Sequence, residues 1–266
     1  MRLATWNLKQ AVAPKRKMHE LWAWMESNIN PDVVVLTEAK EPDTGIPDGW
    51  TAVWQAGGIG PKRRWGTIVA AKDAELRTVD SIGVGRSTKS FAMPFPGAVE
   101  VVDVVVNGSV WATVVGTYAL TIDLDGKSCG HGGHSITQIL SALKPLCESD
   151  RGDRLIVAGD MNLWPRDVSH RFKRLGLVDL IEDTRDQRDP LPDCANCKDD
   201  PVANCGHLWT HKNGNSPNAA RQQIDFIFAS EKMAQRLESI HGGVQDFHDA
   251  WDVSDHAPVV AEFQIV

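Results

Sequence analysis

The sequence has no long hydrophobic run, few cysteines and no excess of basic residues, and each absence excludes a class of protein. Its longest apolar stretches, such as 33–36 and 104–106, are far shorter than the roughly 20 residues that a membrane-spanning helix needs. Five unevenly spread cysteines are too few for a disulfide scaffold. With 28 Lys and Arg against 35 Asp and Glu, the net charge is −7, so any nucleic-acid binding must use a local basic patch.

What is present is typical of a soluble globular protein. The chain has 266 residues, of which 42% are hydrophobic, and can therefore bury a sizeable core. No linker rich in Pro, Gly or Ser divides it, which predicts a single domain over 1–266. Because residues 1–7 enter a strand-like segment without an apolar leader, we expect a cytoplasmic location. We expect neither a membrane association nor an obligate protein partner.

Hydrophobic patterning predicts strands that are joined both by hairpins and by helices. Strands are expected at 3–7, 32–36, 50–55, 67–71, 99–106, 110–118, 154–159, 207–211, 224–229 and 258–265. Helices are expected at 18–29, from 136 to about Pro145, where proline should kink or end the helix, at 168–175 and at 231–237. Asn107-Gly108 is a strong hairpin signal. This mixture predicts an α/β (α+β) protein with mixed sheets.

Polar residues gather at the ends of these apolar strands. They are Asn7 after the first strand, Glu38 after the second, Asp160 and Asn162 after 154–159, Asp225 within 224–229, and Asp255-His256 before the last strand. A single acid after a strand is usually a turn or capping residue, but five such places on one edge of the sheets are hard to explain by capping.

This set of side chains predicts phosphate-ester chemistry. Carboxylates without balancing cations repel one another unless a hard cation joins them. Oxygen ligands such as Glu38 and Asp255 suit Mg²⁺, Mn²⁺ or Ca²⁺ rather than zinc. A lone His256 among carboxylates is expected to be partly protonated and able to face an anionic phosphate. Metal, carboxylate base and cationic histidine together suit attack by water on a phosphate ester.

At these positions the sequence resembles the endonuclease/exonuclease/phosphatase superfamily. The matching motifs occur in order along nearly the whole chain: Thr5-Trp6-Asn7, Thr37-Glu38, Gly159-Asp160-Met161-Asn162, Ile224-Asp225-Phe226-Ile227-Phe228 and Ser254-Asp255-His256-Ala257-Pro258. The resemblance implies a four-layer αββα sandwich, in which two mixed β-sheets pack face to face and helices flank them. The active site is then expected at one end of the sandwich.

The resemblance also implies a role for each residue. Glu38 is expected to be the principal metal ligand, with Asn7 and Asp255 beside it in a Mg²⁺ or Mn²⁺ site. Asp160 would orient or deprotonate the attacking water, and Asn162 would hold the water or the phosphate. His256 would bind a non-bridging phosphate oxygen while Asp225 fixes its tautomer and raises its pKa. Tyr118 aligns with a phosphate-contacting position, although a tyrosine at a strand end can equally be a packing residue.

The expected activity is metal-dependent hydrolysis of phosphodiester bonds, with DNA or RNA as the substrate. Lys62, Arg63 and Arg64 could follow a phosphate backbone, or they could be solvated loop residues. Trp164 could contact a base or sugar, and the glycine-rich stretch 129–134 could place a histidine near the substrate. The alternatives are a phosphatase or phosphodiesterase of a small soluble ester, and a catalytically silent binding protein on the same fold.

A cysteine-rich insert at about 190–207 is a separate signal. Cys194, Cys197, Cys205 and His207 could form a closed structural zinc site, with His211 as an alternative fourth ligand. The other interpretation is three thiols without a ligand. A redox role for the C-x2-C pair is less favoured, because no thioredoxin-like βαβ unit surrounds it.

Overall fold

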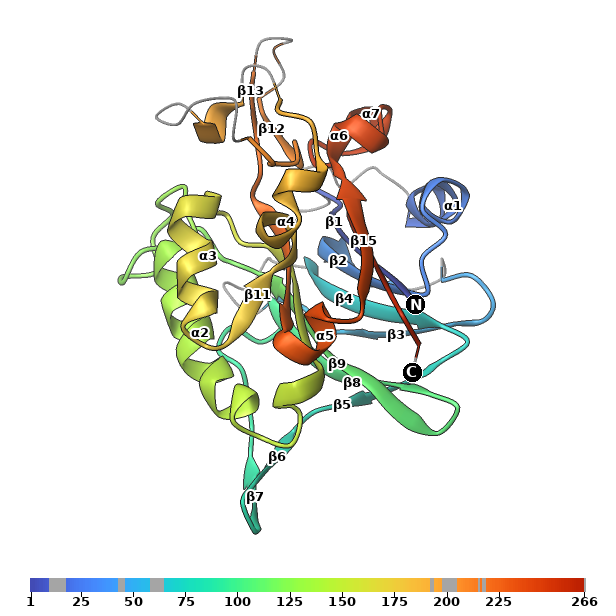
Figure 1. Cartoon of the computed structure of the whole chain (residues 1–266), viewed down its shortest axis with the longest axis vertical. Helices are drawn as coiled ribbons and strands as arrows, with labels where there is room; N and C mark the ends of the chain where they lie inside the picture. The colour runs from blue at the N-terminus through green and yellow to red at the C-terminus, as the bar shows by residue number, and fades with distance from the viewer. Residues whose placement is uncertain are drawn as a thin grey trace.

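The computed structural model describes residues 1–9, 18–42, 46–57, 65–191, 194–197, 205–214, 216 and 219–265. Two six-stranded mixed sheets pack face to face and helices cover their outer surfaces (Figure 1). This confirms the predicted αββα sandwich. Within the described residues, no helix combines the length and the apolar character needed to cross a membrane.

The first sheet contains both ends of the sequence. Its order is β15 (Leu237–Gly242), β16 (Val259–Phe263), β1 (Arg2–Asn7), β2 (Val33–Lys40), β4 (Trp65–Lys72) and β3 (Trp50–Trp54). Strands β1 and β2 are parallel, and the other neighbours are antiparallel. Strand β1 therefore lies between β2, the next strand in the sequence, and β16, the last strand.

The second sheet is built from the middle of the chain. Its order is β11 (Leu177–Asp179), β14 (Asp225–Ser230), β10 (Leu155–Asp160), β9 (Ser109–Tyr118), β8 (Val99–Val106) and β5 (Glu75–Thr78). Two short hairpins, β6–β7 (Ser81–Val84 and Ser87–Ser90) and β12–β13 (His211–Asn213 and Ala220–Gln222), extend from opposite ends of the sandwich (Figure 1).

Strand alternation divides the apolar residues into three layers. Inward-facing side chains form the layer between the sheets, among them Leu3, Val35, Ile156 and Ile227. The outer face of the first sheet packs against α1 (Met18–Asn28), and that of the second packs against α2 (Gly133–Cys147) and α3 (Pro165–Lys173). Four one-turn helices complete the fold: α4 (Leu180–Asp183), α5 (Glu231–Ala234), α6 (Gly243–Asp246) and α7 (Ala250–Val253).

Helix α2 ends at Cys147, two residues after Pro145, and a kink at this proline stays a prediction. Two local predictions were wrong. Residues 207–210 form no strand, and β12 begins only at His211. The helix expected at 231–237 ends at Ala234, and β15, which the patterning did not predict, begins at Leu237.

Candidate active site

Strand alternation brings Asn7, Asp160 and Asp225 into the layer between the sheets. Asp160 and Asp225 lie two positions from the inward-facing Ala158 and Ile227, and Asn7 lies four positions from the inward-facing Leu3, so each continues the core face to the strand end. Asp160 and Asp225 are direct partners in the β10–β14 register. Asn7 is 1% exposed, and its Nδ2 donates to Asp160 Oδ2 at 2.9 Å. The two sheets therefore meet through polar side chains at this end.

Glu38 reaches this cluster through an irregular backbone. Alternation would place it on the outer face with Val34 and Leu36. Its φ is +47°, and the β2–β4 register shifts between Leu36 and Ala39. This bulge turns the carboxylate inward, where Asn7 Nδ2 lies 3.4 Å from Glu38 Oε1. A left-handed non-glycine residue is strained, and such strain is concentrated at functional sites.

His256 is held between two carboxylates. Its Nδ1 lies 2.8 Å from Asp225 Oδ2 and its Nε2 lies 3.9 Å from Asp160 Oδ2. Trp6 Nε1 donates to the carbonyl oxygen of His256 at 2.9 Å, and Ser254 Oγ accepts from its backbone N–H. Burial by itself lowers the pKa of His256, but the neighbouring carboxylates, led by Asp225, outweigh it and raise that pKa to about 10. The side chain is therefore an imidazolium at neutral pH.

The pKa of Asp160 is also raised, but here burial is the main cause of the rise. Burial and then the charge of Asp225 raise its pKa, while the cation of His256 opposes the rise. Its Oδ1 accepts a 2.8 Å hydrogen bond from the backbone N–H of Asn162, whose φ is +46°. Asn162 Nδ2 donates to the carbonyl oxygen of Ala119 at 2.9 Å, which fixes the amide at the end of β10.

Tyr118 lies beside the carboxylates, at the end of β9. It is the partner of Asp160 in the parallel β9–β10 register, and it is 8% exposed. Burial and the charges of Glu38 and Asp160 raise the pKa of its phenol well above the ordinary value. The ring also packs edge-on against Trp65, with centroids 5.0 Å apart. Packing and proximity to the polar cluster are therefore both present.

Asp255, the residue before His256, contacts the side chains of Lys9 and His211. Lys9 Nζ is 2.5 Å from Asp255 Oδ2, and His211 Nε2 is 3.9 Å from the same oxygen. Burial would raise the pKa of Asp255, but His256 and Lys9 outweigh it and lower that pKa. Its Oδ1 is buried without a hydrogen-bond partner among the described residues.

A short relay of hydrogen bonds fixes the tautomer of His211. Trp164 Nε1 can only donate, so its 3.0 Å contact with Gln222 identifies the amide oxygen there. The Gln222 amide nitrogen therefore donates to His211 Nδ1 at 2.9 Å, and the ring proton lies on Nε2. Burial, followed by the charge of His256, lowers the pKa of His211 to about 3, so the ring is neutral. Its ring centroid is 4.4 Å from that of His256.

A groove of about 720 Å³ opens beside this cluster. Its walls include Asn162, Trp164 and Gln222 together with His131 of the glycine-rich loop. The groove also contains two arginines and one aspartate: Arg166 Nε lies 3.8 Å from Asp167 Oδ2, the guanidinium of Arg166 lies 4.9 Å from the centre of the Trp164 ring, and Arg171 lines the groove beside them. The surface next to the catalytic candidates therefore offers positive charge and a stacking platform, although the net charge of the chain is negative.

The donor set fits a hard divalent cation in part. Asn7 holds the carboxylate of Glu38 near that of Asp160, and Asp255 Oδ1 is buried without a hydrogen-bond partner among the described residues. Oxygen atoms of this kind are the ligands that such a cation prefers. Asn7 was expected beside Glu38, either as a ligand or next to one; its Oδ1 accepts from the Lys9 N–H at 2.8 Å, and its amide nitrogen faces the carboxylates. In this arrangement Asn7 holds Glu38 and Asp160 together. Asp160, Asp225 and His256 also lie within metal-binding distance of one another.

The structure therefore brings together the seven expected polar residues at one end of the sheets: Asn7, Glu38, Asp160, Asn162, Asp225, Asp255 and His256. Lys62, Arg63 and Arg64 lie outside the described residues. Sequence reasoning missed Gln222, Arg166 and Arg171 as site residues, and it considered His211 only as a zinc ligand. Arg166 follows two residues after Trp164, and that closeness was the one available signal.

Comparison with known proteins identifies the family and the fold. The model of the endonuclease/exonuclease/phosphatase family matches residues 4–256. None of the curated protein sequences matches the chain. Among solved structures, an AP endonuclease from Archaeoglobus fulgidus has a TM-score of 0.67 at 16% identity, with all of both chains covered.

Two further structures have the same fold. The 3′ phosphatase NExo from Neisseria, bound to a product DNA hairpin, has a TM-score of 0.62 at 18% identity, again with both chains fully covered. Truncated TDP2 from Caenorhabditis elegans has a TM-score of 0.61 at 13% identity, covering 99% of this chain and 97% of that one. At these identities the likeness shows the fold alone. The family match spans nearly the whole sequence, and the chain belongs to the endonuclease/exonuclease/phosphatase family.

Proposed function

We propose that this protein is a nuclease, which uses Mg²⁺ or Mn²⁺ to hydrolyse phosphodiester bonds in DNA or RNA by attack of an activated water. The observation that carries the proposal is the buried imidazole of His256 between Asp225 and Asp160, beside a groove with two arginines. A fixed positive charge inside a cluster of carboxylates suits an anionic phosphate and a developing negative charge.

The described residues supply the groups for proton transfer and charge stabilisation. His256 Nε2–H would donate to a non-bridging phosphate oxygen, and Asp225 keeps the ring charged and oriented through Nδ1. Asp160 would accept the proton of the attacking water, because burial makes its carboxylate a stronger base than an exposed aspartate. The Asn162 backbone N–H holds the other oxygen of Asp160 and so fixes the direction of the base.

Glu38 is the residue best placed to hold the divalent cation, with Asp255 as a further oxygen donor. When bound, the cation supplies positive charge that stabilises the pentavalent phosphate and its leaving oxygen. Asn7 ties Glu38 to Asp160 through its amide nitrogen, so the metal-binding carboxylate and the general base have a fixed relative position.

The groove favours a polymeric substrate over a small ester. Arg166 and Arg171 can pair with successive phosphates, and Trp164 can stack against a base. The solved structure of the similarly folded Neisseria phosphatase with a DNA hairpin is compatible with this choice.

The first test is a cleavage assay with supercoiled plasmid, single-stranded DNA and structured RNA, each in Mg²⁺, Mn²⁺ or EDTA. We expect metal-dependent cleavage of at least one polymer, and a loss of about 10²-fold or more in His256→Ala. His19→Ala is the matched control, since His19 is exposed on α1. Cleavage that persists unchanged in His256→Ala would overturn the mechanism. Hydrolysis of a chromogenic phosphodiester without cleavage of any polymer would replace the nuclease with a small-ester hydrolase.

A second test addresses the groove. Arg166→Ala should weaken binding of single-stranded DNA, measured in Ca²⁺ or EDTA to prevent cleavage, and should reduce the slope of log K against log salt by about one. Arg77→Ala on β5 is the matched control, because Arg77 pairs with Glu75 on an exposed strand. An unchanged salt slope in Arg166→Ala would show that the polymer binds elsewhere.

A further inference from the structure

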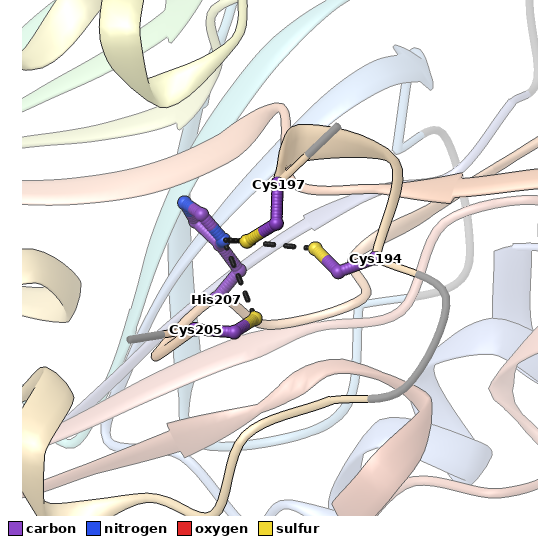
Figure 2. A group of neighbouring side chains, drawn as sticks. All are labelled: Cys194, Cys197, Cys205 and His207. Atoms are coloured by element: carbon purple, nitrogen blue, oxygen red, sulfur yellow. Dashed lines mark hydrogen bonds between the residues drawn. The ribbon is translucent and has the colours of Figure 1, made fainter. Parts of the chain in front are cut away.

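Four side chains of the cysteine-rich insert converge on one point, away from the carboxylate cluster. Cys194, Cys197 and Cys205 are buried, and His207 is partly buried beside them. His207 Nδ1 lies 3.6 Å from Cys194 Sγ, 3.2 Å from Cys197 Sγ and 3.5 Å from Cys205 Sγ (Figure 2). All four potential ligand atoms lie within 4.8 Å of one another, and the cysteines are not joined by disulfides.

These distances are those of a tetrahedral coordination sphere. Zn–S bonds of about 2.3 Å and a Zn–N bond of about 2.0 Å place the nitrogen and each sulfur about 3.5 Å apart at a tetrahedral angle. The three measured separations, 3.2, 3.5 and 3.6 Å, cluster around that value. A set of three sulfurs and one imidazole nitrogen is typical of zinc and leaves no open position for catalysis.

We propose that Cys194, Cys197, Cys205 and His207 bind one structural zinc ion that fixes the loop beside the active site. His207, and not the alternative His211, completes the set, because His207 Nδ1 faces all three sulfurs and His211 does not belong to the cluster.

The ligand segments are hydrogen-bonded to Gln223, two residues before the strand that carries Asp225. Asn196, between the first two cysteines, accepts a 2.8 Å hydrogen bond from the backbone N–H of Gln223. The backbone N–H of Leu208, next to His207, donates to Gln223 Oε1 at 3.1 Å. Residues on both sides of the metal site therefore hold the entry to β14.

The segment that follows His207 continues into the catalytic cluster. Thr210 Oγ1 accepts from the backbone N–H of Asp225 at 3.2 Å, and Thr210 O accepts from Ala257 N at 2.7 Å. The next residue, His211, forms a β-bridge with His256. The proposed ligand His207 lies only four positions before His211, which pairs with the proposed catalytic residue His256. Zinc bound at His207 would thus restrain the segment that contacts the active site.

The test is elemental analysis of the full chain, expressed with zinc and purified without chelators, together with thiol titration. We expect about one zinc per chain, release of that zinc on mercurial modification, and its loss in Cys197→Ser and Cys205→Ser. Cys129→Ser and Cys147→Ser are matched controls that should keep the metal, since neither thiol belongs to the cluster.

Two readouts cover the case in which the serine variants do not fold. Wild-type protein refolded with Co²⁺ should show sulfur-to-cobalt charge-transfer bands and the intense visible bands of a tetrahedral site. Hydrogen exchange of the segment 205–214 should become faster when the mercurial removes zinc. The proposal is overturned if the wild-type protein contains no zinc, or contains iron instead. It is also overturned if zinc remains bound in both Cys197→Ser and Cys205→Ser. None of these readouts requires nuclease activity, so the zinc site and the proposed function fail independently.

Discussion

Asp160 and Asp225 lie opposite each other in the β10–β14 register, both almost completely buried, with the imidazole of His256 reaching both. Two like charges at directly paired positions destabilise a sheet. The imidazolium offsets that repulsion, and the aspartates in turn keep the imidazole charged. The three groups therefore form one unit, in which altering any member changes the protonation of the others.

Replacing Asp225 by Asn should lower the pKa of His256 from about 10 toward or below the ordinary value of 6.5, because burial is then less opposed. We also expect activity at neutral pH to fall by about 10²-fold or more, since the ring loses its charge. Long-range ¹⁵N–¹H spectra of the imidazole would measure the titration, with the exposed His19 as an internal reference. A His256 titration that is the same in Asp225→Asn and wild type would contradict the assignment.

Glu100 gives a prediction about stability against pH. It lies between the sheets opposite Gly116, is 9% exposed, and burial raises its pKa from 4.5 to about 7. The native state thus binds more protons than the unfolded state between pH 4.5 and 7, so this residue makes stability fall as pH rises through that window.

Glu100→Gln should accordingly be more stable than wild type at pH 8, by roughly 1–3 kcal/mol after allowance for solvent screening, and nearly equal to it at pH 4.5. Urea denaturation at both pH values provides the measurement. Glu238→Gln is the control, because Glu238 is exposed on β15. A gain that does not depend on pH would mean that ionisation of Glu100 is not its cause.

Tyr118 is the only tyrosine in the sequence, so tyrosinate absorbance reports on this one side chain. In metal-free native protein, burial and the carboxylates of Glu38 and Asp160 should prevent its ionisation until the protein unfolds at alkaline pH. In urea the same group should titrate near the ordinary pKa of about 10. Absorbance at alkaline pH, compared with circular dichroism, would check this. A native-state step near pH 10 without unfolding is the contrary result.

Gly159 precedes Asp160 in a backbone conformation that only glycine adopts easily. Its φ is +144°, and an added Cβ would lie 1.8 Å from the carbonyl oxygen of Thr117. Gly159→Ala should therefore destabilise the protein by roughly 3 kcal/mol or more, measured by urea denaturation. Gly85→Ala is a matched control with φ of +61° and open space around it, and it should cost only about 1–2 kcal/mol. Equal effects at the two positions would argue against the close strand approach.

Strand alternation explains why much of the site could be predicted from the sequence. Asn7, Asp160 and Asp225 each interrupt an apolar pattern at a strand end, and the sheet geometry then places them together. Glu38 breaks this rule. A simple period of two places it on the outer face, and only the bulge directs it inward, so its position was inferred from the family motif and not from periodicity.

Contacts made across loops could not be predicted in the same way. The relay from Trp164 through Gln222 to His211 joins residues 58 and 11 positions apart, and no local pattern encodes it. The extended segment 207–210 looks like a strand in the sequence, but its backbone bonds mainly to side chains and loops. Short helices such as α5 are similarly set by packing, because a single turn has little intrinsic stability.

The pairing of β1 with β16 joins the first and last strands of the chain, so the polar cluster can assemble only after both have been synthesised. Trp6 donates to the His256 carbonyl, and Ser254 Oγ donates to the Asn7 carbonyl, across sequence separations of 250 and 247 residues. During synthesis, the segment with Asn7 leaves the ribosome long before residues 254–263 exist. A nascent chain therefore has no assembled polar cluster, and the proposed hydrolytic activity should appear in one step when the last strand docks, late in a folding reaction made slow by such distant contacts.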